Sequence, residues 1–316
     1  MERNYTIVTE FIILGFQNLQ ELHNLLFIVF LILYILTITG NVIILSVVRI
    51  DRQLHTPMYF FLSNLSILEI TYTSVVVPKM LSLFLTGNNV ISFTACMTQL
   101  LLFFFLGASE CFLLAVMAYD RYLAICDPLH YASIMHSKVC IQLAVASWML
   151  GFLTTFIPII LISRLSFCGP NVINHFFCDA PPILKLSCSD THMTDIVDLI
   201  CSSTVIVCSF ALILVSYYNI MVTILKMTTA KGKRKALSTC ASHLTSVVIF
   251  YAPGLFLYVR PEASSAFDSN KVVSLLNTIV SPVLNPMIYS LRNQEVKATL
   301  RKLIRRKLRS LDGQQR

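Results

Sequence analysis

The sequence predicts an integral membrane protein made of seven membrane-crossing α-helices. Hydrophobic residues fill 56% of its 316 positions, and charged residues fill 13%, about half their share in a typical soluble domain. One core of this size cannot bury so much apolar surface, so lipid is the expected solvent. Seven apolar stretches of about 20 residues, the length that crosses a bilayer, follow one another along the chain.

The seven expected spans divide the chain into three parts. Transmembrane strands are excluded, because these runs are about twice the length of a barrel strand and open sheet edges cannot be satisfied in lipid. The sequence therefore predicts an N-terminal segment over 1–24, a seven-helix domain over 25–291 and a tail over 292–316. The spans are expected at about 25–48, 58–81, 97–119, 139–162, 199–225, 236–259 and 272–291.

Basic residues indicate the orientation, since lysine and arginine beside a span favour the cytoplasmic side. Most of the 24 basic residues lie after the first, third and fifth spans or in the tail. We therefore expect the N-terminus outside, with span one as an uncleaved signal-anchor, and the C-terminus inside. Asn4, in Asn4-Tyr5-Thr6, is then an N-glycosylation site.

Four of the ten cysteines fall in segments expected outside, where disulfides persist: Cys96, Cys168, Cys178 and Cys188. Four thiols allow three pairings, and the sequence alone does not choose between them. A zinc site with His175 and His192 is the alternative, but these spacings match no compact zinc pattern. We expect disulfides and no metal site.

Other functional classes fit the sequence less well. The net charge of +8 does not indicate nucleic-acid binding, because the basic residues lie in short gaps between apolar runs. A transporter of this size should show an internal repeat or matched broken spans, and neither is found. An intramembrane hydrolase would need metal-ligating histidines or cysteines beside Glu69 and Glu110, so we do not expect an enzyme.

Four sequence motifs identify a family. They are LHTPMYFFLSNLS at 54–66, MAYDRYLAICDPLHY at 117–131, KALSTCASHL at 235–244 and PVLNPMIYSLRN at 282–293. With Gly40-Asn41 and Pro78-Lys79-Met80, they make nearly the whole chain resemble an olfactory receptor of the rhodopsin-like, G-protein-coupled class. The alternatives are a non-olfactory rhodopsin-like receptor, against which the SHL and PMYFFL strings argue, and a heptahelical transporter.

The resemblance implies a receptor of the plasma membrane. It would bind small, mostly hydrophobic odorants within the outer half of the helix bundle. It would then activate a heterotrimeric G protein with a stimulatory or olfactory alpha subunit, which raises cyclic AMP.

Asp120-Arg121-Tyr122 places two charges at the inner membrane boundary, where the acid can hold the guanidinium while spans three and six are closed. The resemblance implies that Arg121 contacts the G protein once span six moves outward, and that Tyr217 helps to hold the open state. His243 is either a polar latch to span three or a neutral histidine bonded to a carbonyl. The resemblance adds four more residues to this activation set: Tyr251, Asn285, Pro286 and Tyr289.

Glu69 and Glu110 are acids inside expected spans, where charge is costly enough to suggest function. Two facing carboxylates would share a proton or bind a cation. The resemblance implies a sodium or proton site here, with Asn41, Asn285 and Ser281 as neighbours, although an aspartate is more usual at the Glu69 position. The alternative is an ordinary hydrogen-bonded interior pair. No other cofactor is expected.

The resemblance also places a ligand pocket between the outer halves of spans three, five, six and seven. No aspartate or lysine occupies the expected lining, which favours a mostly hydrophobic ligand. The expected lining residues are Phe103, Phe104, Gly107, Ala108, Ser202, Val205, Ile206, Leu255, Tyr258, Leu275 and Thr278.

Two further expectations concern the ends of the bundle. We expect Cys96 to pair with Cys178 and Cys168 with Cys188, which would tie span three to the outer loop. The tail alternates apolar residues at helical spacing with basic residues, so it should lie along the inner leaflet and bind membrane lipid.

Overall fold

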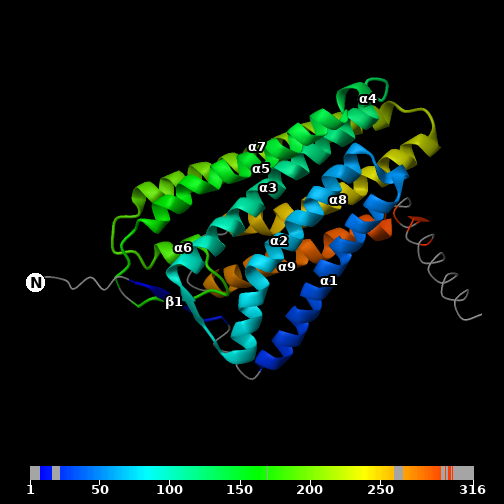
Figure 1. The fold of residues 1–316 in the computed structure, drawn as a ribbon. Coiled ribbons are helices and arrows are strands. Elements are labelled where there is room, and N and C mark those ends of the chain that lie inside the picture. The colour runs from blue at the N-terminus through cyan, green and yellow to red at the C-terminus, as the bar shows by residue number, and fades with distance from the viewer. Residues whose placement is uncertain are drawn as a thin grey trace, which may run out of the picture.

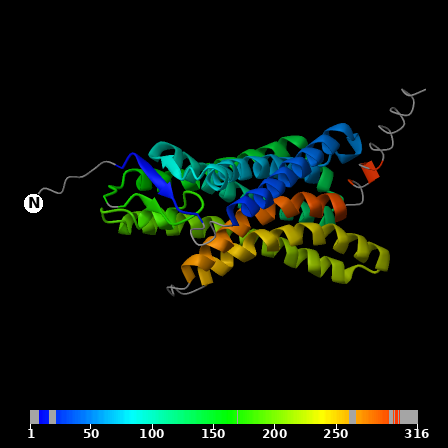
Figure 2. The same ribbon diagram turned by 90° about the horizontal axis from the view of Figure 1, so that it is seen from below.

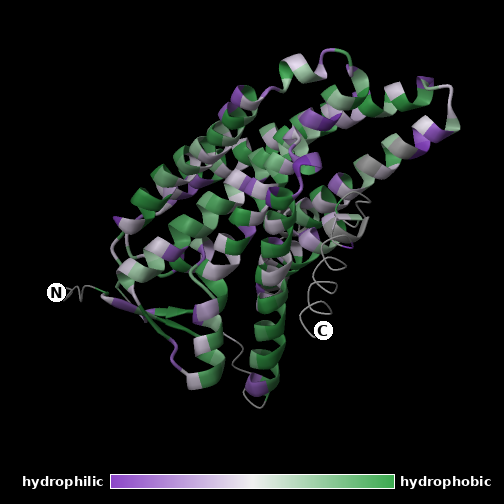
Figure 3. Cartoon of the chain, turned by 45° about the vertical axis from the view of Figure 1, so that its right-hand side comes forward, coloured by the Kyte–Doolittle hydropathy of each residue, from purple (hydrophilic) through white to green (hydrophobic). Residues whose placement is uncertain are grey.

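The computed structural model describes residues 8–15, 22–168, 170–259 and 266–292, with 296, 298, 299 and 301 of the tail. Within them, long helices run side by side in one bundle (Figure 1). Hydrophobic residues recur along the long helices, as the green segments of the cartoon in Figure 3 show. Asn4 and most of the predicted tail helix lie outside the described residues.

Seven of the described helices have 27 or more residues. Five of these, α1, α2, α3, α5 and α7, are long and apolar enough to cross a membrane, so the chain is a multi-pass membrane protein. The described part of α9 adds a shorter apolar stretch, Val273–Tyr289. The seven helices are α1 (His23–Ile50), α2 (Pro57–Thr86), α3 (Phe93–Cys126), α5 (Ser137–Ser163), α7 (His192–Lys226), α8 (Ala230–Val259) and α9 (Ala266–Arg292).

Helix α3 lies at the centre of the bundle, where it contacts α2, α5, α7 and α8. Glycines allow two close helix crossings. A Cβ added to Gly151 of α5 would lie 2.8 Å from the backbone nitrogen of Ser109 in α3. A Cβ on Gly40 of α1 would lie 2.9 Å from the Cβ of Pro286 in α9. Larger side chains at either position would force these helices apart.

The two ends of the bundle are built differently (Figure 2). The Arg121 end carries the 3-10 turn η2 (Arg52–Leu54), the short helix α4 (Tyr131–Ile134) and the connection between α7 and α8. The opposite end carries the cap, by which we mean β1 (Glu10–Ile13), β2 (Val90–Ser92), β3 (Val172–Ile173) and α6 (Ala180–Leu184).

The cap contains a small sheet that the sequence analysis did not predict. Its order is β2-β1-β3, with β1 antiparallel to β2 and parallel to β3, so that Ile12 lies opposite Val90 on one side and Val172 on the other. Alternate side chains of β1, those of Phe11 and Ile13, are at most 1% exposed. The N-terminal segment is thereby fastened to two loops that lie far from it in sequence.

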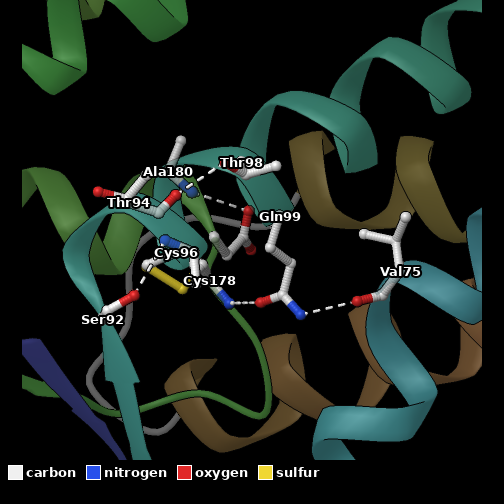
Figure 4. The surroundings of a disulfide bond; sticks show 10 residues. Val75, Ser92, Thr94, Cys96, Thr98, Gln99, Cys178 and Ala180 are labelled. Atoms are coloured by element: carbon white, nitrogen blue, oxygen red, sulfur yellow. Dashed lines mark hydrogen bonds between the residues drawn. A yellow bond between two sulfur atoms is a disulfide. The ribbon is translucent and has the colours of Figure 1, made fainter.

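Two disulfides hold the cap, and both confirm the expected pairs. Cys96 at the start of α3 bonds to Cys178 in the segment between α5 and α7, which we call the cap loop, and their Cα atoms lie 5.6 Å apart. Cys168 bonds to Cys188 within the cap loop, with Cα atoms 5.8 Å apart. Figure 4 shows how Gln99 reinforces the first bond. Its Oε1 accepts from the backbone N–H of Cys178, and its Nε2 donates to the carbonyl of Val75 in α2, both at 2.9 Å.

Helix ends differ from the expected spans by several residues. Helix α8 begins at Ala230 rather than 236, and α9 begins at Ala266 rather than 272. The expected bounds followed apolarity, whereas a helix can continue in polar turns beyond the lipid. Lys231 and Lys233 lie in such a turn of α8.

Candidate functional site

A cavity of about 210 Å³ lies in the half of the bundle next to the cap, between α3, α5, α7, α8 and α9. A cavity of about 150 Å³ is enough to hold benzene, so this one suits a small molecule. Many of the residues that the sequence analysis assigned to the pocket line it: Phe103, Phe104, Gly107, Ala108, Ser202, Val205 and Ile206.

The other assigned residues lie elsewhere or are not described. Leu275 packs in a separate cluster with Val76 and Val77, so it is not part of the lining. Thr278 is fully buried, and its hydroxyl donates to the carbonyl of Ser274 in its own helix. Leu255 and Tyr258 belong to α8, but their side chains lie outside the described residues.

Helix α5 contributes a wall of the pocket that the sequence analysis missed. Thr154, Thr155, Pro158 and Ile159 all line the cavity. The two threonines were a usable signal, because adjacent polar residues interrupt an otherwise apolar span beside an internal proline. Other unassigned lining residues are Tyr72, Cys111, Cys201, Phe250, Gly254 and Asn277.

Asp198 also lines the cavity, although it was not among the expected lining residues, none of which is an aspartate or a lysine. The expected span began at 199 and left Asp198 outside it. Helix α7 in fact begins at His192, and Asp198 lies one turn before Ser202 on the same helix face. The pocket therefore has an acidic group in an otherwise largely apolar wall.

Aromatic rings join the pocket to the cap. Phe103 stacks on Tyr72, with ring centroids 5.1 Å apart, and lies 4.7 Å from the ring of Phe177 in the cap loop. At the far side, the hydroxyl of Tyr251 in α8 lies 2.7 Å from the Oγ of Ser209 in α7. The lining thus contacts both the cap and the α7–α8 pair.

Glu69 of α2 and Glu110 of α3 are both at most 2% exposed and lie close enough to interact electrostatically. Glu69 accepts hydrogen bonds from Asn285 and Asn41. Asn285 also donates to Ser281 at 3.5 Å. Among the described residues, Glu110 Oε1 and the side-chain oxygens of both asparagines have no hydrogen-bond partner. This is a buried group of oxygens of the kind that hard cations bind.

At the Arg121 end, one carboxylate holds two partners. Asp120 Oδ2 lies 2.5 Å from Arg121 Nη2, and Asp120 Oδ1 accepts a 2.7 Å hydrogen bond from the hydroxyl of Tyr131. Burial, and then the charge of Asp120, raise the pKa of Tyr131, so its hydroxyl stays protonated and remains a donor. The neighbouring Tyr122 is half-buried and lies 6.2 Å from the ring of Tyr119.

A second polar contact near this end joins α7 to α8. The hydroxyl of Tyr217 lies 2.8 Å from His243 Nδ1, and the two rings stack with centroids 5.9 Å apart. His243 is fully buried and also approaches the backbone of Leu114 in α3. Tyr289 of α9, another residue that the sequence analysis placed in the activation set, is buried, with 1% of its surface exposed.

Comparisons with known proteins agree with this architecture. The sequence model of the family described as olfactory receptor matches residues 30–307. Human olfactory receptor 6Q1 is 52% identical to this chain over 300 residues, which cover 94% of this chain and 95% of that receptor. Human olfactory receptor 6B1 is 53% identical over 300 residues, covering 95% and 96% of the two chains. Human olfactory receptor 10A7 is 49% identical over 310 residues, 98% of each.

The family match includes the pocket, the Arg121 end and β2, β3 and α6 of the cap. Identity near one half extends over 94% or more of this chain for each of the three relatives. The chain belongs to the olfactory receptor family, whose members are signalling receptors and not enzymes.

Proposed function

We propose that this receptor binds a small, mostly hydrophobic odorant in the 210 Å³ cavity and activates a heterotrimeric G protein of the stimulatory or olfactory type at the plasma membrane, which raises cyclic AMP. One observation carries the proposal. The same two helices, α7 and α8, are joined beside the cavity by Tyr251 and Ser209 and near the Arg121 end by Tyr217 and His243.

This arrangement supports a route from ligand to G protein. A ligand that presses on the cavity wall alters the spacing of α7 and α8 there. Because both helices are continuous, the change reaches the Tyr217–His243 contact and the Asp120–Arg121 pair. Arg121 then leaves Asp120 and contacts the G protein, while Tyr217 stabilises the open arrangement. Asn285, Pro286 and Tyr289 give α9 the bend and the polar groups that rearrange with it.

The proposal includes seven spans with the N-terminus outside. Helices α8 and α9 are the sixth and seventh spans, a view supported by the absence of charged residues from positions 236–259. The two cap disulfides require an oxidising compartment, which supports an outside position for the cap. Arg49, Arg52 and Lys226 flank the other helix ends, as the positive-inside rule requires.

We also propose that Glu69 and Glu110 form one site that holds either a sodium ion or a shared proton. The partnerless oxygens of Glu110, Asn41 and Asn285 support it, because a cation would satisfy them together. A cation there links α1, α2, α3 and α9 and favours the inactive arrangement.

An odorant screen in cells that contain an olfactory-type G protein tests the main proposal, with cyclic AMP as the readout. Arg121→Ala should abolish the odorant response without a matching loss of surface receptor, because Arg121 serves coupling. The control is Arg164→Ala, an exposed arginine at the cap side of α5. An Arg121→Ala receptor that reaches the surface and signals normally would contradict this role.

A further inference from the structure

Asp198 is the acidic group among the described lining residues of the pocket, and its carboxylate is unpaired. It faces the cavity from α7, and within the described part of the chain it has no hydrogen bond or ion pair. Burying part of a carboxylate without a hydrogen-bond or ionic partner costs free energy. A ligand that supplies this partner would therefore bind favourably here.

The charges around Asp198 have the same sign. Its electrostatic neighbours are Asp179 in the cap and Asp195 one turn further out on α7. None of the described lining residues is lysine, arginine or histidine. Lys271, at the cap end of α9, donates to the side chain of Asn174. The surroundings of Asp198 are electronegative, and a cation is the complementary charge.

The neutral polar groups of the lining also favour a donor on the ligand. The hydroxyls of Thr154, Thr155 and Ser202 donate to carbonyls of their own helices, which leaves their oxygens as acceptors. Asn277 Oδ1, in the wall formed by α9, is buried and has no partner among the described residues.

We infer that the odorant is a small apolar molecule with a protonated amine, and that Asp198 binds this ammonium group. The inference rests on the proposed odorant-receptor function and adds the chemical class of the ligand. Phe103, Phe104, Val205 and Ile206 pack around its apolar body, while Asp198 accepts its N–H groups and neutralises its charge. The size of the cavity limits the body to a single ring or a short chain.

Matched odorants test the inference. Hexyl, cyclohexylmethyl and phenylethyl skeletons are each prepared as the primary amine, the alcohol, the methyl ether and the methyl ketone. Cyclic AMP is recorded for the wild type, for Asp198→Asn and for the control Asp190→Asn, with surface receptor measured in the same cells. Asp190 is exposed, lies just before α7 and does not line the cavity, so it matches the charge change outside the pocket.

We expect amines to be the most potent form of at least one skeleton. Asp198→Asn should weaken that amine by about 10-fold or more, the usual value of a hydrogen bond to a charged group, and leave the ether and the ketone unchanged. Asp190→Asn should leave amine potency within about 3-fold, as for an exposed charge.

Two results would overturn the inference in different ways. If ketones or ethers match the amines, or if Asp198→Asn affects every form equally, the amine site is wrong but the odorant receptor stands. If no odorant of any class raises cyclic AMP through a receptor present at the surface, the proposed function fails, and the inference fails with it.

Discussion

The two ends of the bundle use different kinds of bonds. Two disulfides and a three-stranded sheet hold the cap. At the Arg121 end, helices meet through single polar contacts: Tyr131 of α4 with Asp120 of α3, Tyr217 with His243, and Cys126 with Thr223 at 3.1 Å. Covalent and sheet bonds fix one geometry, whereas single hydrogen bonds exchange partners at little cost. The cap end therefore suits a preformed pocket, and the Arg121 end suits a switch.

Loss of the Cys96–Cys178 bond should have the largest effect. Cys96→Ser removes the covalent link between α3 and the cap loop, which typically costs about 2 to 5 kcal/mol of unfolding free energy. We expect little receptor at the cell surface and a lower melting temperature in detergent. Cys208→Ser, at an exposed free cysteine of α7, is the control. Equal surface levels for the two variants would show that the cap does not depend on this bond.

The acid pair, between the two ends, should give the next largest effect. Raising sodium should weaken agonist potency, because a cation that prefers the inactive state opposes the agonist, with typical couplings of about 5- to 150-fold. Glu110→Gln should blunt this dependence and Glu10→Gln, in the exposed part of β1, should not. Dose–response curves at high and low sodium, with ionic strength held constant by a bulky organic cation, decide the matter. Equal sodium dependence in wild type and Glu110→Gln would show that Glu69 and Glu110 are ordinary buried polar residues and not a cation site.

A smaller change is expected from Tyr131→Phe, which removes one donor from Asp120 without altering the ring. One such bond contributes about 1 kcal/mol, so basal cyclic AMP per surface receptor should rise by roughly 5-fold at most. The control is Tyr119→Phe, whose ring is 40% exposed on the same side of the bundle. Unchanged basal signalling in Tyr131→Phe would show that Arg121 is held by Asp120 alone.

The smallest effect is expected from a change of pH, which titrates two groups of the segment between β3 and α6. Burial, and then the charge of Lys271, lower the pKa of His175 to about 4, while burial raises the pKa of Asp179 to about 6. His175 stabilises the fold above its unfolded pKa of about 6.5 and loses this contribution as pH falls toward 4. Asp179 acts in the opposite sense, since its contribution is present below about 3.8 and is lost as pH rises through 6.

These opposite shifts should nearly cancel in the wild type between pH 7.5 and 5. His175→Gln leaves Asp179 alone, so its melting temperature should rise by a few degrees on acidification, and that of Asp179→Asn should fall. Thermal unfolding of the purified receptors at both pH values measures this. Parallel pH profiles for the two variants would rule out opposing titrations in the cap.

The same comparison explains what the sequence predicted. The spans were visible in apolar runs, and Asp120, Arg121, Tyr217 and His243 were visible in local motifs, because each motif is one short contiguous stretch of sequence. The sheet was not visible, since Ile12 pairs with Val90 and Val172 far along the chain.

The pocket was predicted in part for a related reason. Phe103, Ser202 and Val205 followed from positions relative to motifs on their own helices. Thr154 and Pro158 line the cavity because α5 packs closely on α3 at Gly151, a tertiary contact at which the local pattern of polar residues beside a proline only hints. Asp198 was missed because the end of an apolar run was mistaken for the end of a helix.

The place of β1 in the middle of its sheet also constrains biosynthesis. Glu10–Ile13 is made before both segments that bond to its edges, β2 at Val90–Ser92 and β3 at Val172–Ile173. During synthesis the strand must wait, with Phe11 and Ile13 uncovered, until four long helices have emerged from the ribosome. This sheet can therefore close only after α5 has been made.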